Sequence, residues 1–150
     1  MKEKIQNSEL LIETFGKFPT FYDAEVVQIL LKRKNNGKYG PTLEASICII
    51  NYNSGEKFLV KLSFMNIFGL KLENFNYQNV LGDLYVSDFS EEFFENIKHD
   101  KRLLGVVSKT EVEGLNYYVK FEYCFGIEAK FLCSGIVIDS VNLWSDDLEN

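Results

Sequence analysis

Apolar and polar residues alternate one by one through much of the chain, and this period of two constrains the fold more than any other feature. The longest alternation covers residues 57–72, where one face is apolar from Phe58 to Leu72. Residues 115–125 repeat the pattern, with an apolar residue at every odd position. Successive side chains of a strand point to opposite faces, so the chain is predicted to consist mainly of half-buried strands.

Seven segments are predicted as strands. They lie at residues 24–33, 42–52, 57–72, 81–87, 102–112, 115–125 and 127–139. Turn residues separate them, for example at Asn36-Gly37, where the backbone tolerates positive φ. Breaks in the apolar face near Asn66 and near Ser134-Gly135 predict a bulge or bend inside two of the segments. Short strands joined by turns predict a curled, mostly antiparallel sheet arranged as a meander.

Two short helices complete the predicted α+β fold. Residues 8–15 have helical spacing, with Asn7 or Ser8 able to cap the start and Gly16 placed to end it. Asp88-Phe89-Ser90-Glu91 resembles a capping box and predicts a helix over residues 89–98. The helices are expected to pack on one face or end of the sheet.

Length and composition indicate one domain over residues 1–150, with no repeat or Pro/Ser-rich linker. The apolar run near the N-terminus, Leu10-Leu11-Ile12, is too short for a signal peptide or a membrane span, so a cytoplasmic protein without membrane contact is expected. The three cysteines, Cys48, Cys124 and Cys133, form no C-x-x-C motif, and strand-like apolar surroundings predict buried free thiols.

The charge balance favours basic partners. The chain carries 16 lysines and arginines against 22 aspartates and glutamates, a formal net charge of −6. A nucleic-acid binder needs a basic face that displaces counterions from phosphate, so that class is excluded. A negative field instead speeds the encounter with a positively charged protein.

Candidate catalytic and metal-binding residues are few. The single histidine, His99, is expected to be solvated at the end of the second predicted helix. A zinc site needs about three or four His, Cys or acidic ligands at local spacing, and no such cluster occurs in the sequence. Motifs for phosphate-binding loops, nucleophile elbows and zinc proteases are missing as well. The sequence therefore predicts no catalytic residue, no metal and no cofactor.

One pair of acids leaves an enzymatic alternative open. Asp23 and Glu25 are two residues apart, and on a strand they would face the same side, where one pKa could shift for acid/base work. The other interpretations are a cap at the strand entry and an acidic surface that meets a basic partner. A shared cleft with both carboxylates would support the enzyme.

Residues 15–26 concentrate aromatic, turn-forming and acidic residues in one segment. Such a cluster can plug the end of a sheet, or it can present an acidic and aromatic surface to a partner. The candidate partner-binding residues are Phe18, Pro19, Phe21, Tyr22, Asp23 and Glu25.

The same segment resembles the signature of the immunity protein 50 family, F-G-x-W-P-S-F-H-D-A-E-V, which follows a short leucine-containing helix. Residues 41–45 and the amide-rich residues 72–80 are similar to further parts of the family pattern. Phe18 stands at the Trp position and Tyr22 at the His position. Tyrosine cannot replace imidazole in proton transfer near neutral pH, so the substitution favours a structural or binding role.

The resemblance implies a non-enzymatic antitoxin: a protein that binds a cognate, basic bacterial toxin domain inside the producing cell and covers its active site. The runner-up is a small-molecule or lipid-binding β-domain, because curled antiparallel sheets with aromatic interiors can enclose ligands.

Overall fold

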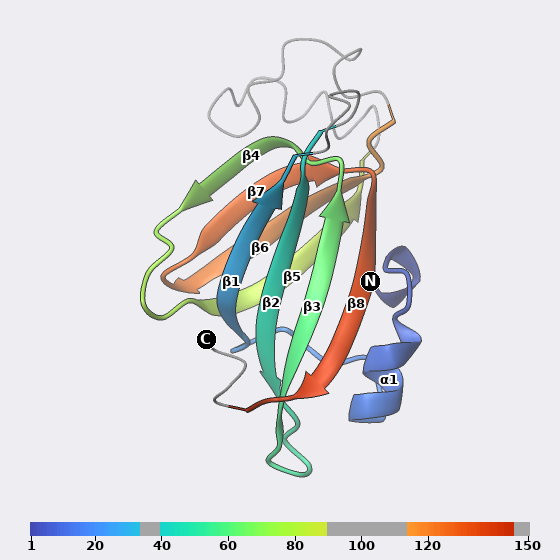
Figure 1. Ribbon diagram of the computed structural model, residues 1–150, viewed down its shortest axis with the longest axis vertical. Helices are drawn as coiled ribbons and strands as arrows, with labels where there is room; N and C mark the ends of the chain where they lie inside the picture. Colours follow the sequence, from blue (N-terminus) through green and yellow to red (C-terminus); the bar gives the residue numbers. More distant parts are fainter. Residues whose placement is uncertain (34–39, 90–113, 146–150) are drawn as a thin grey trace.

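The computed structural model describes residues 1–33, 40–89 and 114–145. Most of these residues belong to a single sheet, flanked by one α-helix and one 3₁₀ turn (Figure 1). The elements are η1 (Lys2–Lys4), α1 (Glu9–Phe15), β1 (Glu25–Lys32), β2 (Thr42–Ile50), β3 (Lys57–Met65), β4 (Phe68–Glu73), β5 (Val80–Asp88), β6 (Tyr117–Phe125), β7 (Glu128–Cys133) and β8 (Gly135–Leu143).

The strands follow the order β4-β7-β6-β5-β1-β2-β3-β8, and each neighbouring pair is antiparallel. The sheet is open, and it folds on itself where β1 meets β5, because those strands share only the register pair Glu25–Val80. In Figure 1, β1, β2, β3 and β8 form the front layer, and β4 to β7 lie behind it. The α+β class with a curled antiparallel sheet is therefore confirmed.

Two chain segments bend from one layer into the other, which explains the strand count. β3 continues into β4 through Asn66, whose φ is 51°, and β7 continues into β8 through Ser134. The Asn66 side-chain amide donates to the Ser134 hydroxyl at 3.0 Å, and the Ser134 backbone N–H donates to Met65 O at 2.8 Å. The interruptions predicted near Asn66 and near Ser134-Gly135 are both present, and each divides its predicted segment into two strands.

The other sequence predictions fare unevenly. Six of the seven predicted strands appear, divided into eight, while residues 102–112 and all of the predicted helix over 89–98 except Phe89 lie outside the described residues. The helix at 8–15 is present as α1. A simple meander is wrong beyond the runs β1-β2-β3 and β5-β6-β7, because β8 returns to pair with β3 and β5 meets β1. Alternation predicts that a segment is a strand, but it does not specify its distant neighbours.

The core lies between the two layers, and three phenylalanines join them. Phe64 of β3 contacts Phe131 of β7 with ring centroids 5.1 Å apart, and Phe121 of β6 at 5.8 Å. Phe121 and Phe131 are 5.9 Å apart and meet edge to face, a favourable geometry for aromatic pairs. All three side chains are fully buried.

The N-terminal segment covers part of the free edge of β8. Gln6 N donates to Ile136 O at 2.9 Å, and Ile138 N donates to Gln6 O at 3.0 Å, forming a short parallel bridge. Helix α1 then lies beside β8 (Figure 1) and buries Leu11 and Phe15. Covering an edge strand in this way removes backbone groups that would otherwise pair with another chain.

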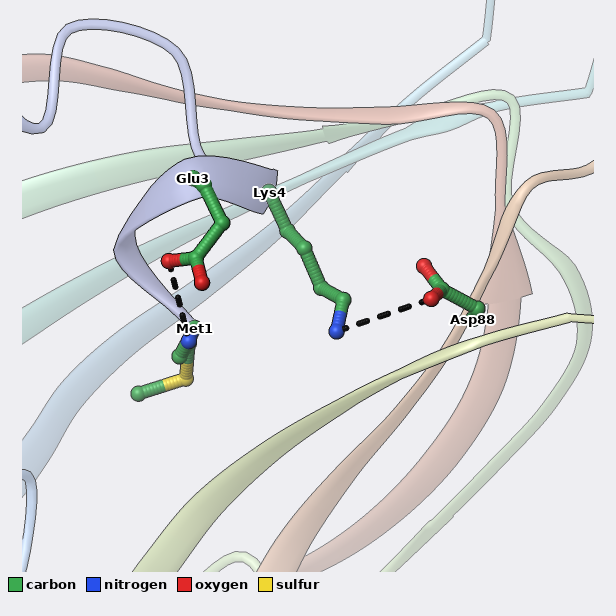
Figure 2. Close-up of polar contacts among 4 residues, drawn as sticks. All are labelled: Met1, Glu3, Lys4 and Asp88. Atoms are coloured by element: carbon green, nitrogen blue, oxygen red, sulfur yellow. Dashed lines mark hydrogen bonds and ion pairs between the residues drawn. The ribbon is translucent and has the colours of Figure 1, made fainter.

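Charged contacts tie the first residues to β5. Lys4 Nζ lies 3.8 Å from an Asp88 carboxylate oxygen, and the Met1 ammonium lies 3.4 Å from a Glu3 carboxylate oxygen; both contacts are drawn in Figure 2. A backbone hydrogen bond, followed by the hydrogen bond and charge of that ammonium, lowers the pKa of Glu3. Because Glu3 and Asp88 are largely exposed, these pairs orient the segment and add little stability.

The three cysteines are free thiols, but they are not all buried as predicted. Cys133 is buried, Cys48 is half-buried and Cys124 is exposed. Cys124 lies near the end of β6, where its sequence neighbours Tyr123 and Phe125 are exposed as well. Apolar neighbours in the sequence therefore do not predict that a side chain is buried at this end of the strand. Burial raises the pKa of the Cys133 thiol to about 12.

This difference predicts selective labelling. At pH 8 a thiol reagent such as Ellman's reagent is expected to modify Cys124 rapidly, whereas Cys133 reacts only after unfolding, because it is both inaccessible and protonated. The rate of colour release measures this. A Cys124→Ser variant should lose the fast phase, and persistence of that phase would contradict the assignment.

Candidate partner-binding site

The segment between α1 and β1 is anchored to the start of β5. Helix α1 ends at Gly16, whose φ is 80°, and the loop that follows passes through Asp23 with a φ of 61°. Asp23 N donates to Leu81 O at 3.0 Å, and Leu81 N donates to Ala24 O at 2.8 Å. The loop therefore closes the end of the sheet where the two layers separate.

Three of the candidate residues face inward. Phe21 is fully buried, Pro19 is buried and Phe18 is half-buried against the core. The rings of Phe18 and Phe21 are 6.2 Å apart and tilted. Their burial agrees with the interpretation of this segment as a plug at the end of the sheet, and Pro19 also borders the small pocket described next.

Tyr22 and Asp23 face outward and line a small pocket. The pocket has a volume of about 160 Å³, and its opposite side is the end of β2 and the following turn, residues 49–53. Tyr22 is 58% exposed and Tyr52, across the pocket, is 72% exposed. The lining is mainly apolar, with Asp23 and Lys17 as its charged members.

Glu25 lines a different cavity, so the predicted pairing of Asp23 with Glu25 is wrong. Asp23 has a left-handed backbone and lies before β1, which begins at Glu25, so the rule that residues i and i+2 share a strand face does not apply. Asp23 borders the small pocket, whereas Glu25 borders a groove of about 600 Å³ beside the loop that joins β4 to β5. The two residues therefore line different cavities.

Sequence reasoning missed several residues of these surfaces, chiefly Tyr52, Tyr77 and Lys61. Tyr77 is 85% exposed and lies in an amide-rich loop, and Tyr52 lies in a turn. An aromatic residue among turn-forming polar residues has no strand face on which to be buried. This sequence context could have predicted that both tyrosines are exposed. Lys61 gives no such signal, because a lysine at an outward strand position is ordinary.

The described ranges 1–33, 40–89 and 114–145 do not meet the needs of a metal site. They contain no group of three or more His, Cys, Asp or Glu side chains that could hold a metal ion. His99 lies outside them.

None of the helices in the described ranges is both long enough and apolar enough to cross a membrane.

Together these features define a small α+β protein whose candidate site is an open surface of aromatic and acidic side chains. The family model of Immunity protein 50 matches residues 7–144, and the chain belongs to this family. The match includes the plug and the exposed residues of the 15–26 segment, so the resemblance noted in the sequence is confirmed. No curated protein and no solved structure matches the chain significantly.

Proposed function

We propose that this protein binds a cognate bacterial toxin domain in the cytoplasm of the producing cell and neutralises it by covering its active site, with no reaction of its own. The observation that carries the proposal is the family match over residues 7–144. The net charge of −6 supports a basic partner, since complementary charge accelerates association. Occlusion requires a stable interface and no catalytic residue.

The exposed part of the 15–26 segment is the proposed centre of the interface. Tyr22 is an exposed aromatic residue, and aromatic residues are enriched among those that contribute most to binding. Asp23 and Glu25 place carboxylates on either side of Ala24, beside the small pocket and the groove respectively. In this proposal Phe18, Pro19 and Phe21 serve the interface indirectly, by fixing the backbone that carries Tyr22.

Co-expression tests the function directly. The probe is the C-terminal domain of the secreted toxin expected to be encoded beside this gene, produced from an inducible promoter in a bacterial host. Co-expression with the full chain should restore growth, and the two proteins should co-purify. Failure of rescue together with failure to co-purify, despite good expression of both proteins, would reject the proposal.

Variants of the exposed residues should weaken the complex without unfolding the protein. Tyr22→Ala is expected to raise the dissociation constant by about tenfold or more. Asp23→Asn removes the charge and retains a residue that tolerates positive φ, so a smaller rise, about threefold to tenfold, should follow without backbone strain. Titration calorimetry measures both.

Glu13→Gln is the matched control, because Glu13 is an exposed acid on α1 that lines neither the small pocket nor the groove. Dissociation constants that match the wild-type value for Tyr22→Ala and Asp23→Asn would move the interface elsewhere.

Packing between the layers of the described residues counts against the runner-up, a lipid or small molecule enclosed by the sheet. The space between the layers is occupied by the rings of Phe64, Phe121 and Phe131.

A further inference from the structure

The groove that Glu25 borders has a floor made by three adjacent strands. Gln28 of β1, Ser46 of β2 and Lys61 of β3 are direct register partners and form a polar row across the sheet. Glu25 and Leu59 border the same groove from the first and third strands. Opposite charges thus lie on one floor, with a hydroxyl and an amide between them.

The loop of residues 74–79 forms the wall of this groove and is held rigidly. Asn79 is buried, and its side chain closes a double contact with Asn76: its Oδ1 accepts from Asn76 N and its Nδ2 donates to Asn76 O, both at 2.8 Å. Val26 N donates to Asn79 O at 2.8 Å and fixes the loop to β1. Such a loop can present side chains without a large loss of conformational entropy on binding.

Two aromatic side chains stand along the wall. Phe75 is 46% exposed, and Tyr77, at 85%, meets the ring of Phe125 edge to face with centroids 6.5 Å apart. Exposed aromatic residues around a polar floor resemble the composition of protein–protein interfaces, where Tyr, Trp and Phe are enriched.

The polar groups of the floor have no partners within the described residues. The side chains of Glu25, Gln28, Ser46 and Lys61 make no hydrogen bond or ion pair there. Ser46 is only 7% exposed, but it lines the groove, so its hydroxyl can be reached by a group that binds there. An occupant that donates to Glu25 and accepts from Ser46 and Lys61 would satisfy the floor.

We propose that the toxin partner inserts a segment of its chain into this groove, with a basic side chain on Glu25 and a carbonyl or carboxylate oxygen on Lys61 and Ser46. The inference rests on the proposed function and names the place and the chemistry of contact. A protein segment fits better than a small molecule because the groove is open and polar, whereas small-molecule sites are mostly enclosed and apolar.

Binding of groove variants tests the inference. The probe is the purified toxin domain that co-purifies with the wild-type protein, and titration calorimetry gives the dissociation constant. Lys61→Glu should raise that constant by about 30-fold or more, because it places a like charge opposite the acceptor. Tyr77→Ala should raise it about tenfold or more. Both side chains are exposed, so circular dichroism should show an unchanged fold.

Lys57→Glu is the matched control, because Lys57 is an exposed lysine on the same strand that does not line the groove. It should change the dissociation constant less than about threefold, in keeping with the small effect of a charge away from contact.

The outcomes separate this inference from the proposed function. If the wild-type protein binds the toxin domain and both groove variants, Lys61→Glu and Tyr77→Ala, bind it as tightly as the wild type does, the groove is not the contact and the inference is overturned while the proposed function stands. If the wild-type protein binds no toxin domain, both fall. Native mass spectrometry tests the alternative that the groove binds a small molecule. A small molecule that is bound to the wild-type protein and absent from the Lys61→Glu variant, with toxin affinity unchanged, would overturn the inference in favour of a ligand site.

Discussion

Replacing Phe64 with alanine is expected to lower the free energy of unfolding by about 3–5 kcal/mol, the range for large aromatic side chains removed from a core. Phe64 is fully buried and contacts Phe121 and Phe131, which belong to the opposite layer. Strand pairing between the layers is short in the described part of the chain, because β1 and β5 share one register pair, and the two bent segments supply the other covalent links. Loss of this ring therefore weakens the packing that holds the layers together.

Urea unfolding followed by tryptophan fluorescence and circular dichroism measures this change. Phe75→Ala is the matched control, because Phe75 is 46% exposed on the groove wall and should cost less than about 1 kcal/mol. Domains of this size are stable by about 5–15 kcal/mol, so a loss of this size removes a large share of the total stability and should lower the urea midpoint clearly. A loss below about 1 kcal/mol for Phe64→Ala would show that the three rings do not join the layers.

The local features of the fold could be predicted because each depends on a short stretch of sequence. The alternation of apolar and polar residues predicts β2, β3, β6 and β8. Gly16 predicts the end of α1, because the residue after a helix often adopts a left-handed backbone conformation that suits glycine. Asn66 and Ser134 were recognised as interruptions because each breaks an apolar face. Their mutual hydrogen bond, which turns two interruptions into one shared corner, links residues 68 positions apart and gives no local signal.

The candidate site was predictable only in part, for a similar reason. The 15–26 segment stood out by composition, but the division into buried Phe21 and exposed Tyr22 depends on the positive φ of Asp23 and on its contact with Leu81. The groove combines residues of β1, β2, β3 and the 74–79 loop. Ser46 and Lys61 are ordinary residues in their own strands, and only strand pairing makes them neighbours.

Replacing Gly126 with alanine is expected to have the second large effect, because this position supports the groove wall. Gly126 has a φ of 81°, and a Cβ there would lie 2.7 Å from Asn79 Oδ1 and collide with the carbonyl oxygen of Gln78. Left-handed backbone costs about 1–2 kcal/mol for alanine, and an overpacked contact adds about 1–3 kcal/mol. A loss of about 2–5 kcal/mol in the free energy of unfolding should follow.

Gly55→Ala separates the two contributions. Gly55 has a φ of 75°, and a Cβ there would meet nothing within 4 Å, so only the backbone cost of about 1–2 kcal/mol remains. The difference between the two variants, measured by urea unfolding, is the contribution of the contact with the 74–79 loop. Because the collision also displaces Asn79, which holds that loop, Gly126→Ala should weaken toxin binding while Gly55→Ala should not. Equal losses of stability and equal toxin affinities in the two variants would mean that the 74–79 loop moves aside at no cost in free energy. The wall of the groove would then not be the rigid surface that partner binding requires.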